Sequence, residues 1–192
     1  MSINNVRDDL IIRTKKGISM IYVGVCYWLI LGVLSFIEMD IKLLGLIYFI
    51  GAGMIFPMGI MVSKLLKMDL MANDNPLAPI GGVLGGMQIL FSPVLILIYV
   101  EHIQWLPFFI AVLTGAHFLP FATIYKSKAY IFQSIAVIVV TSIIGLIAME
   151  KIYVILPFVL SAIYFCTCLL LIGENRKVKN SDPMNMIKSK NV

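Results

Sequence analysis

Six stretches of 20 or 21 residues contain no Asp, Glu, Lys or Arg, and they constrain this chain more than any other feature. A helix that crosses the roughly 30 Å hydrocarbon core of a bilayer needs about 20 apolar residues. Backbone groups in that core must hydrogen-bond internally, and these stretches lack the alternation of barrel strands, so helices are expected. The sequence therefore predicts an all-α, polytopic integral membrane protein, a bundle of six transmembrane helices. Their predicted bounds are 18–37, 43–62, 80–100, 105–125, 130–149 and 152–172.

The composition supports the same class. Of the 192 residues, 60% are hydrophobic and only 13% are charged, whereas a soluble domain is about one quarter charged. These values exclude an ordinary soluble domain, a disordered chain and a nucleic-acid-binding domain. The net charge of +5 is then interpreted as a sign of membrane topology, and no nucleic-acid partner is expected.

The basic residues predict the orientation. Only Lys42 and Lys151 lie in the connections 38–42, 101–104 and 150–151. Cytoplasmic segments of membrane proteins are enriched in Lys and Arg, so both termini are expected in the cytoplasm of a multi-pass cell-membrane protein. The other 13 of the 15 basic residues lie in segments 1–17, 63–79, 126–129 and 173–192.

Three parts follow from this arrangement. Residues 1–17 are predicted to be a cytoplasmic N-terminal tail, residues 18–172 the transmembrane domain, and residues 173–192 a cytoplasmic basic tail. Basic residues just beyond a span attract anionic lipid. The bilayer is therefore the expected partner, with anionic lipid bound at the cytoplasmic face through Arg176, Lys177 and Lys179. The polar residues beyond about 180 are expected to be loosely ordered.

No catalytic motif is visible. The chain has no Gly-rich phosphate loop, no paired carboxylates within the spans and no His-rich metal spacing, so no metal, cofactor or catalytic residue is predicted. An enzyme is disfavoured. Cys26, Cys166 and Cys168 lie in apolar helices and are interpreted as small apolar filler.

His117 is the exception within the predicted spans, because its side chain titrates near neutral pH. Gln88 lies at equal depth across the hairpin of the third and fourth spans, and Thr114 precedes His117 by three residues. Ser92 continues a small, polar stripe with Gln88. Two interpretations stay open for this layer. The polar side chains bond to each other and join two helices, worth about 0.6–2 kcal/mol, or they form a ligand or proton site.

Glycine and proline mark the same region. Gly81, Gly82, Gly85 and Gly86 form two overlapping small-xxx-small pairs, which predict close packing against another helix, with a flexible gate as the alternative. Pro93 and Pro120 remove backbone donors near Gln88 and His117. Asn73–Pro76 is a turn signal, and a helix is expected to start near Pro79.

Four sequence runs carry a resemblance to a known family. They are Lys15-Lys16-Gly17, Asn75-Pro76-Leu77, the segment Gly115 to Pro120, and the segment Tyr125 to Tyr130. With them, nearly the whole chain resembles an uncharacterised family of small multi-pass bacterial membrane proteins that carry a domain of unknown function. The resemblance implies a membrane location but no established activity and no catalytic residue. The six short helices are also similar in architecture to the substrate-binding subunits of energy-coupling vitamin transporters, which is an analogy of fold alone.

Two classes of function follow. The first is a small-molecule binding or transport-related protein with its site near His117, Gln88, Ser92 and Thr114. The second is a structural, sensory or regulatory membrane protein that carries no ligand. A cavity at the polar layer would favour the first class, and a dry, filled bundle the second. A homo-oligomer or a membrane partner subunit fits either class.

Overall fold

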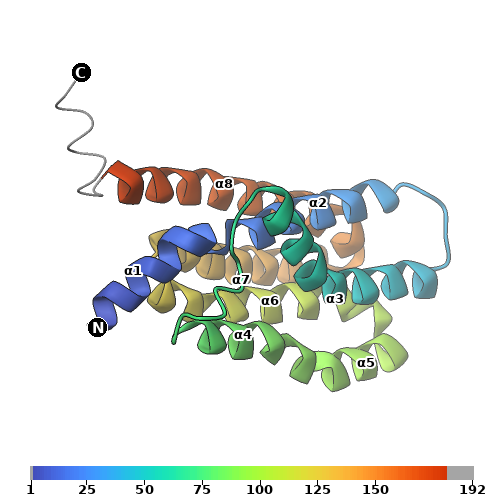
Figure 1. Cartoon of the computed structure of the whole chain (residues 1–192). Coiled ribbons are helices and arrows are strands. Elements are labelled where there is room, and N and C mark those ends of the chain that lie inside the picture. Colours follow the sequence, from blue (N-terminus) through green and yellow to red (C-terminus); the bar gives the residue numbers. More distant parts are fainter. Residues whose placement is uncertain (1, 181–192) are drawn as a thin grey trace.

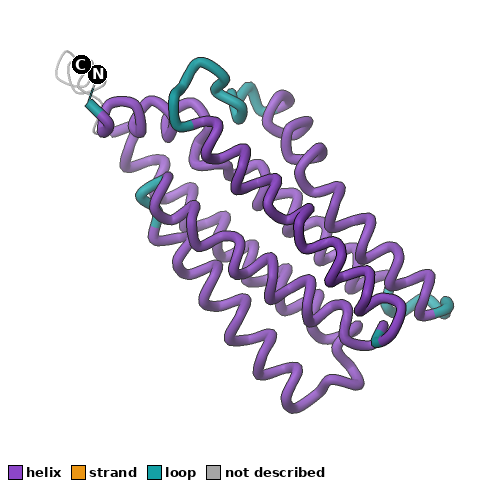
Figure 2. The backbone as a smooth tube through the Cα atoms, turned by 90° about the horizontal axis from the view of Figure 1, so that it is seen from below, coloured by secondary structure: helices purple, strands orange, loops and turns teal. Residues whose placement is uncertain are grey.

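The computed structural model describes residues 2–180, and that range contains helices and turns but no strand. The helices lie side by side in one elongated bundle (Figure 1, Figure 2). The all-α prediction is confirmed. The helices are α1 (Ile3–Thr14), α2 (Ile18–Leu34), α3 (Ile41–Leu65), α4 (Ala78–Gly86), α5 (Ser92–Glu101), α6 (Leu106–Ile124), α7 (Lys128–Ala148) and α8 (Ile152–Asn180).

Five helical stretches of the described chain are long and apolar enough to cross a membrane. The last of them contains two helices, α7 and α8, which run antiparallel and meet at the turn Met149–Lys151 (Figure 1). All six apolar segments of the sequence fall on helical structure, with the third divided between α4 and α5. The five stretches are Ile3–Leu34, Ile41–Leu65, Ala78–Glu101, Ile103–Ile124 and Lys128–Val178.

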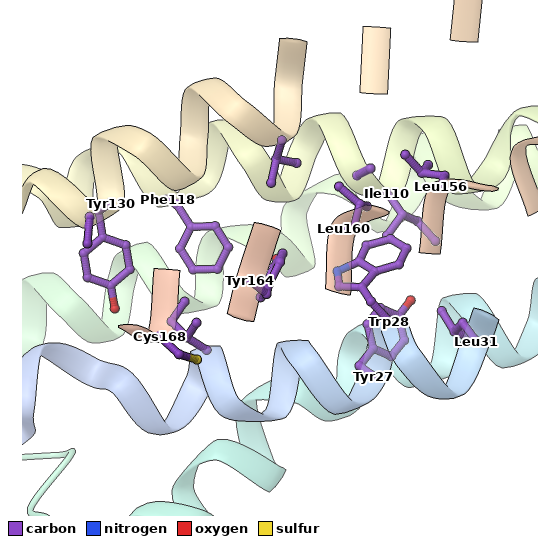
Figure 3. Close-up of a cluster of buried hydrophobic side chains, with 14 of the residues drawn as sticks. Tyr27, Trp28, Leu31, Ile110, Phe118, Tyr130, Leu156, Leu160, Tyr164 and Cys168 are labelled. Carbon is purple, nitrogen blue, oxygen red and sulfur yellow. The ribbon is translucent and has the colours of Figure 1, made fainter. Parts of the chain in front are cut away.

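The most extensive packing is that of α6 on α7 and of α2 on α8. Trp28 of α2 and Tyr164 of α8 are almost fully buried, and the Tyr164 ring contacts Phe118 of α6 with 5.8 Å between centroids (Figure 3). Gly24 of α2 faces this tyrosine, and a Cβ atom at Gly24 would overlap the Tyr164 ring. The missing side chain therefore lets α2 and α8 approach closely, as small residues do between membrane helices.

Helices α4 and α5 lie at the edge of the bundle (Figure 1). No residue of α4 is buried, and α5 buries only Leu95 and Ile98. A Cβ atom at Gly81, Gly82 or Gly86 would meet no atom within 4 Å. The prediction that these glycines pack against another helix is therefore wrong for those three positions in the described chain. The small-xxx-small spacing failed because it says nothing about whether a partner helix reaches that face.

The segment predicted as an N-terminal tail contains helix α1, which buries Leu10 and Ile11. Residues Lys15, Lys16 and Gly17 have positive φ and turn the chain sharply into α2. At the other terminus, α8 continues beyond residue 172 to Asn180. The segment beyond residue 180, expected to be loosely ordered, lies outside the described residues.

Arg13 fastens α1 to the loop between α3 and α4. Its guanidinium group bonds to Asp69 and Asp74 of that loop, with shortest N–O distances of 2.5 Å, and to Asp9 of α1 at 3.4 Å. The Asn75 amide adds bonds to the Val6 carbonyl and to Asp9, each 2.8 Å long. The predicted turn therefore serves as a docking point for α1, and α4 follows it with Pro79 in its first turn, as expected.

This network predicts a pH dependence. The hydrogen bonds from Arg13 hold the pKa of the Asp69 and Asp74 carboxyl groups below their usual value near 4. A lowered pKa in the folded state stabilises the fold above the ordinary carboxyl pKa, and this contribution is lost as the pH falls through the lowered values. The thermal midpoint in detergent should therefore drop on acidification from about pH 6 to pH 3. The drop should be smaller in the double variant Asp69→Asn/Asp74→Asn than in Asp8→Asn, and equal drops would contradict the network's role.

Candidate functional site

A cavity of about 120 Å³ lies beside α4 and opens partly to the surface. The loop side chains Leu70 and Met71 and Leu10 of α1 line it at the end of the bundle that carries α1. The cavity continues inward to Gln88 and Thr114. Every helix except α5 contributes a lining residue, so the cavity is a feature of the whole bundle.

The predicted polar layer borders this cavity. Thr114 and His117 lie three residues apart on α6, so both side chains occupy one face of the helix. Gln88 lies in the 3₁₀ turn Met87–Phe91, which interrupts the span between α4 and α5. The Gln88 amide donates a hydrogen bond of 3.3 Å to the Thr114 hydroxyl. Gln88, Thr114 and His117 all line the cavity, as the interpretation of the polar layer as a ligand site requires.

The side chain of His117 has no hydrogen-bond partner within residues 2–180. Only 7% of the residue is exposed, and its Nδ1 atom is fully buried and unpaired. The ring packs edge-on against Phe121, with 5.3 Å between centroids. The hydrogen bond expected between His117 and Gln88 is therefore not formed, since the amide bonds to Thr114 instead. The Nδ1 atom is one of seven buried side-chain N or O atoms without a partner among the described residues, and His117 is the one of those seven residues that lines the cavity.

Ser92 is the predicted site residue that does not line the cavity. The sequence argument placed Ser92 under Gln88 by α-helical spacing. The residues from Met87 to Phe91 instead form a 3₁₀ helix, which has 3.0 residues per turn rather than 3.6. That tighter winding rotates Ser92 off the Gln88 face. Pro93 then occupies the first turn of α5, where its missing N–H costs no bond.

Aromatic side chains make up much of the cavity wall, and they were absent from the sequence prediction. Three of them stack in series: the Phe121 ring lies 6.0 Å from Tyr125, and Tyr125 lies 5.9 Å from Tyr130. The spacing of residues 118, 121 and 125 along α6 follows a helical period, which was the available signal. Aromatic residues are common in apolar helices, so that signal alone is weak. The lining aromatic residues are Phe56, Phe118, Phe121, Tyr125, Tyr130 and Tyr164.

Three glycines of α4 form another part of the wall. Gly81, Gly82 and Gly85 line the cavity, and a Cβ atom at Gly85 would lie 3.4 Å from the ring of Phe56, which also lines it. Gly86 does not line the cavity. The absence of side chains on this face of α4 therefore keeps the space open.

The electrostatic character of the cavity is neutral, because no Asp, Glu, Lys or Arg is among its lining residues. Among the described residues, no group of three or more His, Cys, Asp or Glu side chains could hold a metal ion. The polar side-chain groups that line the cavity are thus hydroxyl, amide and imidazole groups.

A charged cluster that the sequence analysis missed lies next to this wall. The Lys16 ammonium group pairs with Glu174 of α8 at 2.7 Å, and the Lys16 side chain is only 5% exposed. The second carboxylate oxygen of Glu174 accepts bonds from the backbone N–H groups of Lys128 and Ala129 at the start of α7. Tyr130 donates its hydroxyl to the Lys16 carbonyl at 2.6 Å. The cluster joins residues 158 positions apart, a distance at which no sequence motif connects them.

Comparison with known proteins gives one family. No curated protein and no solved structure matches the chain significantly. The match to the family described as "Family of unknown function (DUF7010)" covers residues 3–174, from α1 to the Glu174 carboxylate that closes the charged cluster. It confirms the resemblance to a family of unknown function and leaves the activity open. The chain belongs to the DUF7010 family.

Proposed function

We propose that the protein is a six-pass integral membrane protein that binds a small molecule in the cavity beside α4. The apolar lengths of α2, α3, the α4–α5 pair, α6, α7 and α8 support six crossings. The uneven distribution of Lys and Arg supports cytoplasmic termini. In that orientation the cavity lies toward the cytoplasmic side, below α1 and the α3–α4 loop. The basic residues Arg176 and Lys177 then lie at the cytoplasmic face, where anionic lipid would meet them.

The unpaired imidazole of His117 at the cavity wall carries the binding proposal. A dry, filled bundle would have supported a purely structural protein. A space of about 120 Å³ holds several water molecules or one small ligand. Such a ligand would bond to the Nε2 atom of His117, because the Nδ1 atom is fully buried and only Nε2 is left to face the cavity. The break in the helix at Gln88 is also typical of transporter sites, where irregular backbone lines a cavity. We therefore extend the proposal to transport: the molecule that binds in the cavity would also be carried across the membrane.

Cysteine labelling tests the cavity. In a variant without the three native cysteines, Thr114→Cys should react with a small thiosulfonate reagent, because Thr114 lines the cavity. Thr141→Cys should be protected, because Thr141 is fully buried in α7 and does not line the cavity. Adding Gly85→Leu should slow the reaction at residue 114 by filling the space, whereas Gly86→Leu should leave it unchanged. An unreactive Thr114→Cys would refute an accessible cavity.

Cysteine labelling on intact cells tests the orientation of the chain in the membrane. A membrane-impermeant maleimide should label Asp40→Cys directly, and Lys64→Cys only after permeabilisation. Both side chains are exposed at opposite ends of α3, so access to the reagent depends on the side of the membrane. The reverse pattern would overturn the proposed topology.

A further inference from the structure

We infer that the cavity recognises an uncharged, single-ring aromatic molecule that carries a hydroxyl group, which bonds to the imidazole of His117. This inference rests on the proposed binding function and adds the chemical class of the ligand. Charge, hydrogen bonding and volume lead to it separately.

The charge of the wall excludes most ionic ligands. No Asp, Glu, Lys or Arg side chain lines the cavity, so an ion that entered it would lose its hydration without gaining a permanently charged counter-ion. An aromatic cage can bind an ammonium group without a carboxylate, but it needs free ring faces. Here the rings cover each other. Phe118 and Tyr130 stack at 22°, Phe121 and Tyr125 at 21°, and Tyr125 and Tyr130 at 29°. The wall therefore favours a neutral ligand.

The polar atoms specify the hydrogen-bonding group. A neutral imidazole has one donor and one acceptor nitrogen, and a hydroxyl group both donates and accepts, so it suits either tautomer of His117. The Thr114 oxygen already accepts a bond from Gln88, which leaves its own hydroxyl hydrogen to donate. A ligand hydroxyl between these two α6 side chains would be matched by both.

The volume and the walls define the rest of the molecule. An engineered cavity of about 150 Å³ lined by apolar side chains binds benzene, and the present cavity is of similar size. Its wall is mainly aromatic on the side of α6, α7 and α8 and made of glycine on the side of α4. Flat ligands pack against rings with offset or edge-on contacts. One aromatic ring fits this space, whereas a two-chain lipid does not.

Fluorine NMR tests the class with para-fluorophenol, using the whole protein in lipid nanodiscs. Partition of the phenol into lipid is common to all variants, so the difference between variants measures the site. We expect para-fluorophenol to bind the wild type and Gly86→Leu, and to lose binding in Gly85→Leu. His117→Leu should weaken binding about five- to tenfold, the value of one hydrogen bond, and His117→Gln should restore most of it.

Three matched compounds make the test decisive. Fluorobenzene lacks the hydroxyl group, so its affinity should be the same in wild type and His117→Leu. The anion para-fluorobenzoate and the cation para-fluorobenzylammonium should bind more weakly than the phenol. Tighter binding of either ion, or equal binding of the phenol to wild type and His117→Leu, would overturn the inference. If no ring compound binds while Thr114→Cys still reacts with thiosulfonate, the ligand class is wrong and the accessible cavity stands. If Thr114→Cys is also unreactive, the proposed function itself fails.

Discussion

Glu174→Ala should destabilise the protein by about 3 kcal/mol, because it leaves the buried ammonium group of Lys16 without its counter-ion. This is the largest loss expected for any single charged residue. The substitution also removes the acceptor of two backbone N–H groups at the start of α7. Glu101→Ala is the matched control, since Glu101 is exposed at the opposite end of the bundle and forms no ion pair in the described chain. Unfolding in detergent micelles, followed by circular dichroism, measures both losses.

The double variant Lys16→Met/Glu174→Met separates the ion pair from the loss of packing. The double variant should cost clearly less than the sum of the losses in the single variants Lys16→Met and Glu174→Met, because neither charge is then left unpaired. Additive losses, or a Glu174→Ala variant as stable as Glu101→Ala, would show that the pair contributes nothing.

The second large effect is expected at Gly24. Gly24→Leu should lower stability by about 3 kcal/mol or prevent α2 from packing on α8, because even a Cβ atom there overlaps the ring of Tyr164. That ring is 2% exposed and lies between Phe118 and Trp28, so moving it away from Gly24 would disrupt its packing against both (Figure 3). Thermal unfolding in detergent measures the loss.

Gly53→Leu is the matched control for this substitution. Gly53 lies on α3, and a Cβ atom there meets nothing within 4 Å, so a leucine would project from the bundle without a clash. Combining Gly24→Leu with Tyr164→Ala should recover part of the loss, because the smaller side chain makes room for the leucine. Equal losses at Gly24 and Gly53 would show that close contact of α2 and α8 is not required.

The sequence predicted the helices well because span length and the absence of charge are local properties. The same holds for Gln88, Thr114 and His117, which stand out as polar side chains inside apolar runs. The mutual placement of these three was less predictable. Depth along a hairpin put Gln88 beside His117, but the amide bonds to Thr114 instead.

The errors come from local winding and from long-range contact. The 3₁₀ turn at Met87–Phe91 changes which face Ser92 occupies, and the winding of so short a segment does not follow from its residue types alone. Gly81, Gly82 and Gly86 were expected at a helix interface, but a Cβ atom at any of them would meet no atom within 4 Å. The pairing of Lys16 with Glu174 depends on how the two ends of the chain meet, which is a property of the assembled bundle.

The Glu174 carboxylate also sets an order of assembly. The first turn of α7 is synthesised 46 residues before the oxygen that accepts its N–H bond. Lys16 is synthesised 158 residues before Glu174, the residue that supplies its counter-ion. In the proposed topology, a growing chain would insert most of its apolar helices before Glu174 is synthesised, and the bonds that join the N-terminal segment, α7 and α8 would form late. Chaperones or membrane insertases that act on this chain would meet an open bundle whose first and last helices are not yet joined.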